Sequence, residues 1–244
     1  MKGIILAGGG KEMFYPVTKI INKYLLPIGK YPMLEFSIAK MKQCGISEIA
    51  IIIDKDKAGN IVDYLGSGSR YGVQFTYKIQ DEKFNSVECL ALCERFVGGD
   101  NCLVIPGDNI FFDNISNHVK EFLSKKNGAK VIIHKVGNPD KYNIPEFDGE
   151  KLIGIVEKGN IKKNSYCVTG IYLYDHRVFG IIKQLRMSFN KDIKISDVNN
   201  FYIKEGNMAY GHLKEWWIDV NNFEALNVAS ELSRGLNFDE YLYV

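Results

Sequence analysis

The chain lacks the features that mark nucleic-acid-binding, membrane and repeat proteins. Its 31 lysine and arginine residues nearly balance 29 aspartate and glutamate residues, and the net charge of +2 gives no reason to expect a nucleic-acid partner. No apolar run is long enough to span a membrane, so we expect no membrane partner either. Internal repeats, low-complexity tracts and linkers are also missing. We therefore expect a single globular domain over residues 1–244.

Cysteine is scarce and odd in number, which argues against a disulfide framework. Most of the five cysteines lie inside apolar runs: Cys44, Cys89, Cys93, Cys102 and Cys167. We expect reduced core thiols and hence a cytoplasmic protein. Cys89 and Cys93 are four residues apart, but without histidines nearby core packing explains them better than metal binding. The N-terminal segment has the pattern of a buried strand rather than of a signal peptide.

The first half of the sequence alternates short apolar runs with amphipathic segments. The predicted strands are Lys2–Leu6, Glu48–Ile53, Val73–Ile79, Cys102–Ile105 and Ala129–Lys135. The predicted helices are Met33–Gln43, Ala58–Leu65, Ser86–Arg95 and Ser116–Lys125. Strands that alternate with helices in this way predict an α/β fold, with a doubly wound, mostly parallel sheet and right-handed crossovers.

The pattern changes after Pro139. Strands are predicted at Lys151–Glu157 and Cys167–Tyr174, and helices at His176–Gln184 and Asp197–Glu205. The segment Trp216–Asp219 leads into a last predicted helix at Asn222–Ser233. We expect this second half to form a lobe whose helices and loops cover the open edge of the sheet.

The first 33 residues carry the clearest functional signal. The strand Lys2–Leu6 runs into three glycines, Gly8, Gly9 and Gly10. A strand that opens into a glycine-rich loop lets backbone N–H groups approach a phosphate chain closely. In an α/β fold such a crevice lies beyond the carboxyl ends of the strands. The same loop, however, contains Glu12, whose carboxylate suits a polyphosphate poorly.

This segment resembles the sugar-1-phosphate nucleotidyltransferases, most closely the short-form glucose-1-phosphate thymidylyltransferases. In that family the first strand ends L-A-G-G-x-G-T-R-L-x-P-x-T-K and is followed by K-x-L-L-P. The matching residues are Leu6, Ala7, Gly8, Gly9, Pro16, Thr18, Lys19, Lys23, Leu25, Leu26 and Pro27. Lys11, Glu12 and Met13 stand where the family has G-T-R. The arginine that clamps the nucleotide phosphates is therefore missing, and the signature loop is degenerate.

Two aspartates match the magnesium ligands of the family. Asp108 follows a predicted buried strand, and Asp219 follows Trp216-Trp217-Ile218 as in the family's W-x-D-x-G-T. Taken singly, Asp108 would most often start a turn and Asp219 a helix. Together they are two carboxylates at distant strand ends, a set that suits Mg²⁺ when substrate phosphates complete its shell. The resemblance implies Mg²⁺ as the cofactor, held by both.

The resemblance also implies a sugar subsite. Glu157 and Lys158 correspond to the family's E-E-K-P, in which the glutamate binds sugar hydroxyls and the lysine binds the sugar phosphate. The register comes from the run 166–175, which nearly repeats Y-A-V-T-G-x-Y-x-Y-D. On this basis the expected sugar-binding residues are Tyr142, Asn143, Glu157, Val168, Thr169 and Tyr172. Lys194 replaces a glutamate that meets the sugar or supports its loop.

A nucleotide subsite follows from the same resemblance. Its expected residues are Leu6, Gly8, Gly9, Gly10, Lys11, Gln80, Asn85 and Gly107. Gln80 would read a pyrimidine edge. Asn85 takes the place of a glycine and has the bulky Phe84 beside it, and bulk at this position would obstruct the base or the ribose. The expected catalytic residues are Lys23 on the triphosphate and Lys158 on the sugar phosphate. The nucleotide half would span about residues 1–135 and the sugar-binding half about 136–244.

Three hypotheses on function follow. In the first, the chain is a Mg²⁺-dependent enzyme that transfers a nucleotidyl group from dTTP or another nucleoside triphosphate to a sugar 1-phosphate, with weakened activity. In the second, it is an inactive paralogue that binds a nucleotide sugar or regulates an active partner subunit. In the third, an altered sugar replaces glucose 1-phosphate, which would explain Asn143 and Lys194.

We also expect a homo-oligomer, either a dimer or a tetramer as in the family. The aromatic pairs Phe111-Phe112 and Trp216-Trp217, together with the segment Phe238–Val244, carry more aromatic surface than one small domain easily buries.

Overall fold

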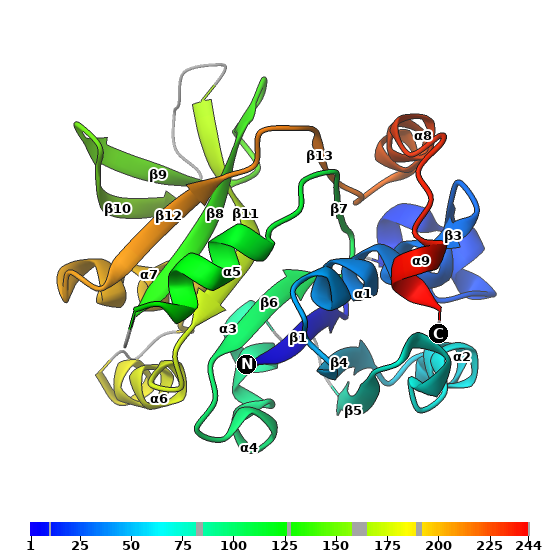
Figure 1. Ribbon diagram of the computed structural model, residues 1–244, viewed down its shortest axis with the longest axis horizontal. Helices are drawn as coiled ribbons and strands as arrows, with labels where there is room; N and C mark the ends of the chain where they lie inside the picture. Colours follow the sequence, from blue (N-terminus) through cyan, green and yellow to red (C-terminus); the bar gives the residue numbers. More distant parts are fainter. Residues whose placement is uncertain (10, 82–84, 126–127, 158–164, 189–191, 244) are drawn as a thin grey trace.

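The computed structural model describes residues 1–9, 11–81, 85–125, 128–157, 165–188 and 192–243. Its centre is a seven-stranded sheet in the order β12-β8-β11-β6-β1-β4-β5 (Figure 1). The strands are β1 Lys2–Ala7, β4 Glu48–Asp54, β5 Gln74–Gln80, β6 Cys102–Pro106, β8 Ala129–Val136, β11 Ser165–Tyr174 and β12 Met208–His212. Within this sheet only β11 runs antiparallel to its neighbours. The expected α/β fold with a mostly parallel sheet is confirmed.

Three two-stranded sheets accompany the large one. They are β2 Pro27–Ile28 with β3 Tyr31–Pro32, β7 Asn109–Phe111 with β13 Trp217–Asp219, and β9 Asn143–Asp148 with β10 Lys151–Glu157. The β7–β13 pair joins segments that are more than a hundred residues apart in the sequence. It therefore joins the residues that directly follow β6 to the segment that precedes the helix beginning at Phe223.

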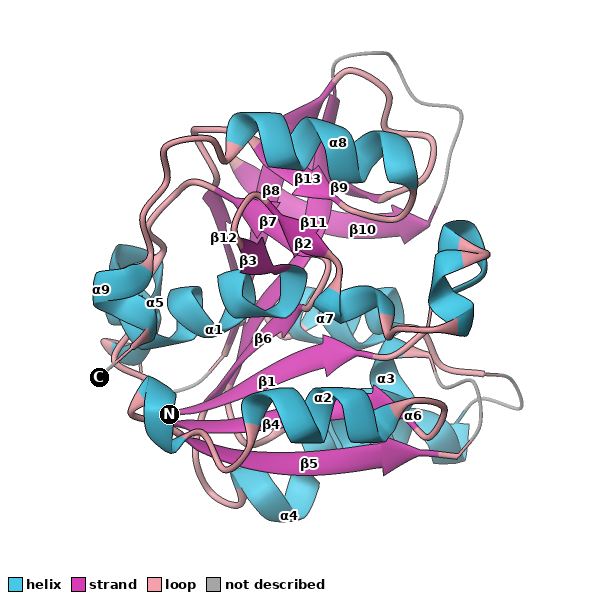
Figure 2. Cartoon of the chain, turned by 90° about the vertical axis from the view of Figure 1, so that its right-hand side faces the viewer, coloured by secondary structure: helices cyan, strands magenta, loops and turns pink. Residues whose placement is uncertain are grey.

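Helices cover both faces of the sheet (Figure 2). The α-helices are α1 Met33–Gln43, α2 Ala58–Leu65, α3 Ser86–Ala91, α4 Glu94–Val97, α5 Ser116–Leu123, α6 Val178–Ser188, α7 Ile195–Lys204, α8 Phe223–Leu232 and α9 Asp239–Leu242. Short 3₁₀ helices lie at η1 Lys11–Phe14, η2 Val17–Lys19, η3 Lys23–Leu25 and η4 Ser69–Tyr71. The predicted helix Ser86–Arg95 is in fact two helices, α3 and α4.

Alternate side chains of the central strands enter two different hydrophobic clusters. Ile5 and Ile51 pack with α1 on one face, whereas Ile4 and Ile52 pack with α3 and α6 on the other. Burial on both faces explains why these strands have continuous apolar sequences, as parallel strands usually do. Cys89 and Cys93 lie in the second cluster, as expected for core thiols, and all five cysteines are free.

The chain order reverses at β1, which has β4 on one side and β6 on the other. In doubly wound sheets such a reversal opens a crevice beyond the carboxyl ends of the two diverging strands. Here those ends are the loop after Ala7 and the loop after Pro106, so the glycine-rich segment and Asp108 lie at the switch point. Figure 2 shows β1, β4 and β5 ending on the same side of the molecule.

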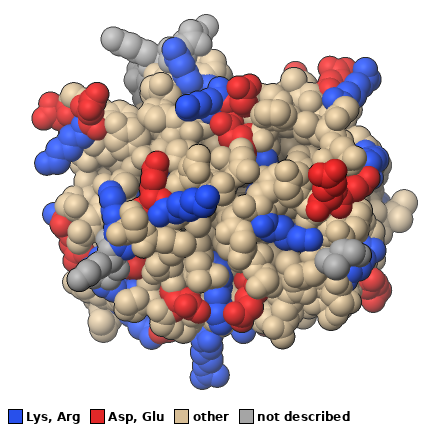
Figure 3. Space-filling model, in the orientation of Figure 1, with Lys and Arg blue, Asp and Glu red and all other residues tan. Residues whose placement is uncertain are grey.

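The outer surface carries both signs of charge. On the face shown in Figure 3, lysine and arginine side chains are interspersed with aspartate and glutamate side chains. Among the described residues, no helix has the length and apolarity that crossing a membrane requires.

Candidate functional site

The loop after β1 is shaped by close contacts around Gly8. A Cβ on Gly8 would lie 2.4 Å from Gln80 Nε2 and 3.0 Å from Asp54 Oδ1, so no other residue fits without a shift of its neighbours. Gly9 has a φ of +83°, in the region that glycine adopts most readily. The Tyr24 hydroxyl donates to the Gly8 carbonyl at 3.0 Å and fixes this loop against η3.

Gly107 plays a similar part at the end of β6. Its N–H donates to the Leu6 carbonyl at 2.8 Å, and a Cβ there would lie 3.0 Å from the Tyr24 ring. The two loops at the switch point are thus tied to each other through Leu6, Tyr24 and Gly107. This brings the predicted nucleotide-binding residues Leu6, Gly8, Gly9 and Gly107 together.

Lys23 forms an ion pair with Asp108 in this crevice. Lys23 Nζ lies 2.8 Å from Asp108 Oδ2, and the lysine side chain is only 4% exposed. Its ammonium also lies 4.7 Å from the centre of the Tyr24 ring. Asn22 begins the 3₁₀ helix that carries it, since its Oδ1 accepts from Tyr24 N at 3.1 Å. A buried ammonium next to a carboxylate is a preorganised positive charge at the switch point.

Asp219 reaches the same place through the β7–β13 pair. It lies opposite Asn109 in the register, and Val220 N donates to the Asp108 carbonyl at 2.8 Å. Burial raises the pKa of Asp219 to about 6, and the nearby charge of Asp108 contributes to the increase. The structure therefore brings together the two aspartates that were predicted from distant strand ends.

These two carboxylates fit a hard cation that takes its other ligands from a substrate. No set of three or more histidine, cysteine, aspartate or glutamate side chains suited to a metal occurs among the described residues. A structural zinc site, which needs four protein ligands, is thus not formed by the described residues. Mg²⁺ is commonly held by one or two carboxylates plus substrate phosphates, which is the donor set that Asp108 and Asp219 offer.

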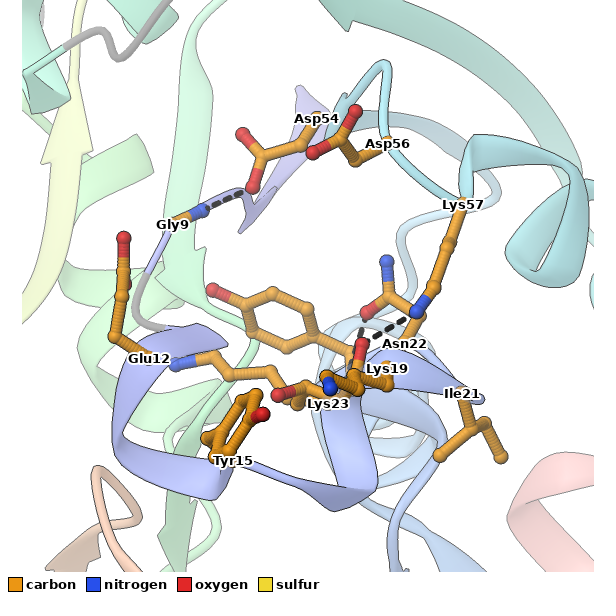
Figure 4. Close-up of a pocket in the computed structure, with 12 residues that line it drawn as sticks. Gly9, Glu12, Tyr15, Lys19, Ile21, Asn22, Lys23, Asp54, Asp56 and Lys57 are labelled. Atoms are coloured by element: carbon orange, nitrogen blue, oxygen red, sulfur yellow. Dashed lines mark hydrogen bonds between the residues drawn. The ribbon is translucent and has the colours of Figure 1, made fainter.

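A cavity of about 500 Å³ opens beside this crevice (Figure 4). It is lined by Gly9, Glu12, Tyr15, Thr18, Lys19, Ile21, Asn22, Lys23, Tyr24, Asp54, Asp56 and Lys57. Figure 4 shows Asp54 and Asp56 on one side of the cavity, and Tyr15, Lys19 and Lys23 on the other. Its size suits a small ligand such as a nucleotide.

The Gln80 side chain makes hydrogen bonds within the protein, and its contact with a base stays a prediction. Its side chain is 3% exposed, its Nε2 donates to Asp54 Oδ1, and its Oε1 accepts from Cys89 Sγ at 3.0 Å. Asp54 Oδ2 accepts from Gly9 N at 2.7 Å. The sequence did not predict this role for Asp54, although its place at the end of β4, next to β1, puts it at the same edge as the glycine loop.

Asn85 serves as the N-cap of α3. Its Oδ1 accepts from Val87 N and Glu88 N, and the Glu88 carboxylate accepts from Asn85 N, which completes a capping box. Its Nδ2 donates to the Ile193 carbonyl at 3.1 Å. These bonds occupy the side chain, so its nucleotide contact stays a prediction.

The predicted sugar-binding residues Tyr142 and Asn143 lie where β9 begins. Tyr142 packs edge-on against Trp217 with ring centres 5.3 Å apart, and Asn143 lies opposite Glu157 in the β9–β10 register. Burial and the nearby Asp219 raise the pKa of Tyr142, which keeps its hydroxyl protonated. A second cavity, of about 290 Å³, is lined in part by Lys141, Tyr142, Asp219 and Asn221.

Glu157 is engaged by α7. Lys194 Nζ forms an ion pair with Glu157 Oε2, and Ser196 Oγ donates to Glu157 Oε1 at 3.0 Å. The lysine that replaces a family glutamate is thus directed at the predicted sugar-binding carboxylate. A sugar hydroxyl that binds Glu157 would share this carboxylate with Lys194.

Val168, Thr169 and Tyr172 are buried in β11. Val168 and Tyr172 belong to the second hydrophobic cluster, and Tyr172 stacks on Tyr174 at 5.6 Å. The Thr169 hydroxyl donates to the Ile132 carbonyl at 2.8 Å. In this structure these residues pack the sheet, and their contact with a sugar stays a prediction. Gly10, Phe84 and Lys158 lie outside the described residues, and Lys11 is described only as the first residue of η1.

Known proteins resemble the chain over its whole length. The Nucleotidyl transferase family matches residues 2–234. A glucose-1-phosphate thymidylyltransferase of Neisseria meningitidis serogroup A is 31% identical over 248 residues, covering 100% of this chain and 86% of that protein. The protein of the same name from Mycobacterium tuberculosis strain H37Rv is 32% identical over 240 residues, covering 97% and 83%.

Two solved structures agree with these relatives. A Bacillus anthracis protein, assigned as a glucose-1-phosphate thymidylyltransferase and solved in complex with a sucrose, is 46% identical with a TM-score of 0.93, covering 97% of this chain and 96% of that one. An apo UDP-glucose pyrophosphorylase has a TM-score of 0.79 at 19% identity, covering 96% and 98%. The second likeness shows the fold alone.

The fold first defines a class, the doubly wound α/β proteins whose crevice lies at the switch point of a mostly parallel sheet. The match over nearly the whole chain then identifies the family. The chain belongs to the nucleotidyl transferase family, and the resemblance to the sugar-1-phosphate nucleotidyltransferases is confirmed.

Proposed function

We propose that the chain transfers a nucleotidyl group from a nucleoside triphosphate to a sugar 1-phosphate and releases pyrophosphate. The observation that carries this proposal is the cluster at the switch point, where the buried Lys23 ammonium lies 2.8 Å from Asp108 and where β13 brings Asp219 alongside. The names of the relatives, glucose-1-phosphate thymidylyltransferases, support the same reaction and the same class of sugar substrate.

In this reaction an oxygen of the sugar phosphate attacks the α-phosphorus of the triphosphate in line, and pyrophosphate leaves. Such a reaction needs little covalent help, so positioning and charge neutralisation carry the catalysis. Lys23 supplies a fixed positive charge for the triphosphate. Asp108 and Asp219 would hold Mg²⁺, which when bound neutralises charge on the phosphates.

The two halves of the chain would divide the substrates. The cavity beside Gly9 and Lys23 would hold the nucleotide, and the cavity beside Tyr142 and Asp219 would hold the sugar. Asp219 lines the second cavity, and Lys23, the ion-pair partner of Asp108, lines the first. The transferred phosphorus would lie between the two cavities. Lys158 would bind the sugar phosphate, as the family resemblance implies.

We infer that turnover is slow. The loop has Met13, which is 59% exposed and uncharged, where the family has an arginine, and the acidic Glu12 lines the nucleotide cavity. A lysine such as Lys11 is a point charge and cannot replace the bidentate fork of an arginine. Losing one preorganised donor at a transition state typically lowers the rate by about 10²–10³-fold.

One pair of observations favours the second hypothesis, an inactive nucleotide-sugar-binding paralogue. The Gly9 N–H already donates to Asp54, and Glu157 already forms an ion pair with Lys194. Groups of the protein therefore use part of the predicted nucleotide subsite and part of the predicted sugar subsite. A nucleotide sugar carries two phosphates rather than three and depends less on the altered loop. Its binding would therefore persist when triphosphate binding is weak.

The test is pyrophosphate release with glucose 1-phosphate, Mg²⁺ and each common nucleoside triphosphate in turn. We expect slow release that needs both substrates and that Lys23→Met lowers by about 10²-fold or more. Lys30→Met is a matched control, because Lys30 also lies 2.8 Å from an aspartate, Asp239, and over a tyrosine ring. This control should keep the wild-type rate.

Absence of release with every triphosphate, combined with binding of a nucleotide sugar in calorimetry, would reject the enzyme and establish the binding paralogue. Equal rates for the Lys23→Met and Lys30→Met variants would show that the chemistry is not at the switch point.

A further inference from the structure

We propose that Lys57 binds the terminal phosphates of the nucleoside triphosphate and so partly replaces the arginine that the signature loop lacks. This inference rests on the proposed nucleotidyl transfer, and it adds to the nucleotide site a residue outside the family motifs. Lys57 lies in the turn between β4 and α2, and it lines the cavity of about 500 Å³ together with Gly9 and Lys23. Glu12 of the altered loop lines the same cavity.

Two of the lysines that line this cavity differ in their partners. Lys23 forms an ion pair with Asp108. The Lys57 ammonium donates to the Thr18 carbonyl, which is its single hydrogen-bond partner in the described part of the chain. No carboxylate among the described residues forms an ion pair with Lys57. Its positive charge is therefore not cancelled by a neighbouring group and is available to an anionic ligand.

The hydrogen bond to Thr18 holds the Lys57 ammonium in one place. It joins the turn after β4 to η2, although the two residues are 39 positions apart in the sequence. Figure 4 shows the Lys57 side chain extending along the cavity towards the segment that carries Lys19 and Asn22. An ammonium has three N–H groups, so two remain for phosphate oxygens. The contact thus fixes the position of the charge before a ligand binds.

The backbone at Lys57 has a conformation that glycine would adopt more readily. Its φ of +60° and ψ of 24° lie in the left-handed region, and no other non-glycine residue in the described part of the chain has a positive φ. This conformation is unfavourable for an L-amino acid because Cβ comes close to the backbone carbonyl. Residues under such strain cluster at ligand sites. A lysine in this turn is therefore explained better by a function of its side chain than by the backbone.

The two lysines would serve different phosphates of the triphosphate. Lys23 contacts Asp108, where the transfer would take place. Lys57 forms an ion pair with neither Asp108 nor Asp219, so it would meet the β- and γ-phosphates, which leave as pyrophosphate. Met13 supplies no charge to these phosphates, whereas a lysine is a suitable point charge for them. A lysine lacks the planar fork of an arginine, so the replacement is partial.

The experiment is a calorimetric titration of the full chain with dTMP and with the Mg²⁺ complexes of dTTP and pyrophosphate. Lys57→Met nearly keeps the length of the side chain but removes its charge. This variant should bind dTTP and pyrophosphate about tenfold or more weakly than the wild type. Its affinity for dTMP should stay within about twofold, because dTMP lacks the phosphates that Lys57 meets. Lys57→Arg keeps the charge and should restore most of the affinity for dTTP.

Lys55→Met is the matched control, since Lys55 is exposed in the same turn, is not one of the residues that line the cavity, and carries the same charge. It should leave all three affinities within about twofold of the wild type. The melting temperature without ligand shows that each variant is folded. Lys57→Gly removes the charge and also relieves the backbone strain, so it repeats the test with a turn that does not depend on this side chain.

The outcomes separate this inference from the proposed function. Equal affinities for dTTP in Lys57→Met and Lys55→Met would overturn the inference while leaving nucleotidyl transfer intact. A loss of dTMP affinity as large as that of dTTP would also overturn it, because Lys57 would then not act on the terminal phosphates. Binding of dTTP by Lys57→Arg as weak as by Lys57→Met would show that the positive charge is not what binds. Failure of pyrophosphate and of every common nucleoside triphosphate to bind to the wild type would reject the proposed function and the inference with it.

Discussion

At the scale of single residues, the crevice depends on Gly8. Its backbone passes so close to Gln80 and Asp54 that a Cβ would come within 2.4 Å of the Gln80 amide. This close approach brings the glycine loop to the ends of β4 and β5, where the Gly9 N–H donates to Asp54.

Gly8→Ala should weaken nucleotide binding about tenfold or more, because Gln80 and Asp54 must move to admit the methyl group. Titration calorimetry with the preferred nucleotide measures this. Gly59→Ala in α2 is the control, since a Cβ there meets nothing within 4 Å. It should leave binding unchanged and raise the free energy of unfolding by about 0.5–1 kcal/mol. Unchanged binding in Gly8→Ala would mean that this loop does not form the site.

Lys40 is a buried ammonium away from the crevice. Its Nζ donates to the Phe112 and Asp113 carbonyls at 2.8 and 2.9 Å, and burial lowers its pKa from 10.5 to about 8. Between these two pKa values the unfolded chain binds more protons than the folded one. Lys40 therefore contributes stability that is fully present above about pH 10.5 and is lost as the pH falls through about 8.

The free energy of unfolding of the wild type, relative to that of Lys40→Met, should rise by about 1–2 kcal/mol between about pH 8 and about pH 9.5. Urea denaturation at the two pH values measures it, and the difference between the proteins removes the titration of all other groups. A constant difference would show that Lys40 keeps an ordinary pKa.

At the scale of elements, Asn85 connects the N-terminus of α3 to a segment that is distant in the sequence. Asn85 caps this helix and also ties it to the Ile193 carbonyl of the segment before α7. The family has a glycine at this position, and glycine is nearly as good an N-cap as asparagine.

Asn85→Gly should therefore lower the free energy of unfolding by only a few tenths of a kcal/mol for the cap, plus about 1 kcal/mol for the lost bond to Ile193. If the side chain obstructs the base, the variant should bind nucleotides more tightly. Asn222→Gly removes the corresponding cap of α8 and is the control, for which we expect no gain in affinity. Weaker binding in Asn85→Gly would identify Asn85 as a direct ligand instead.

Most of the elements could be predicted from the sequence, because buried parallel strands and amphipathic helices have strong patterns. The predicted bounds of α1, α2 and β10 agree with the structure. The short strands β7, β9 and β12 were not predicted. β7 has only three residues, and β9 and β12 are of mixed burial, so each carries little periodic signal. The Asp54–Gln80 contact was also not predicted, because it depends on the register between β4 and β5 rather than on either strand alone.

At the scale of the whole molecule, the aromatic surface is smaller than the sequence suggested. Phe111, Trp217 and Phe238 are buried, at 1%, 6% and 6% exposure. Phe112, Tyr241 and Tyr243 remain 48%, 45% and 41% exposed. Of the aromatic residues on which the expectation of an oligomer was based, these three therefore remain available for an interface.

We still expect a homodimer or homotetramer, as the family resemblance implies. Light scattering at micromolar concentration should give a mass of two or four chains. The double variant Phe112→Ser with Tyr241→Ser should shift this mass towards one chain if the exposed aromatics form the interface. A wild-type monomer at this concentration would reject the prediction.

A nucleotide bound in the switch-point crevice requires that the altered loop at residues 11–13 faces its phosphates. Restoring the family residues with Lys11→Gly, Glu12→Thr and Met13→Arg together tests it, by calorimetric titration with the Mg²⁺ complexes of dTTP and GTP. The arginine adds a charge-assisted hydrogen bond of about 1.5–3 kcal/mol, and one repelling carboxylate is removed. The triple variant should bind both triphosphates about tenfold or more tightly than the wild type, by a similar factor for each because the phosphates are common to both. Equal affinities of the two proteins would place the loop away from the phosphates and would contradict the site described above.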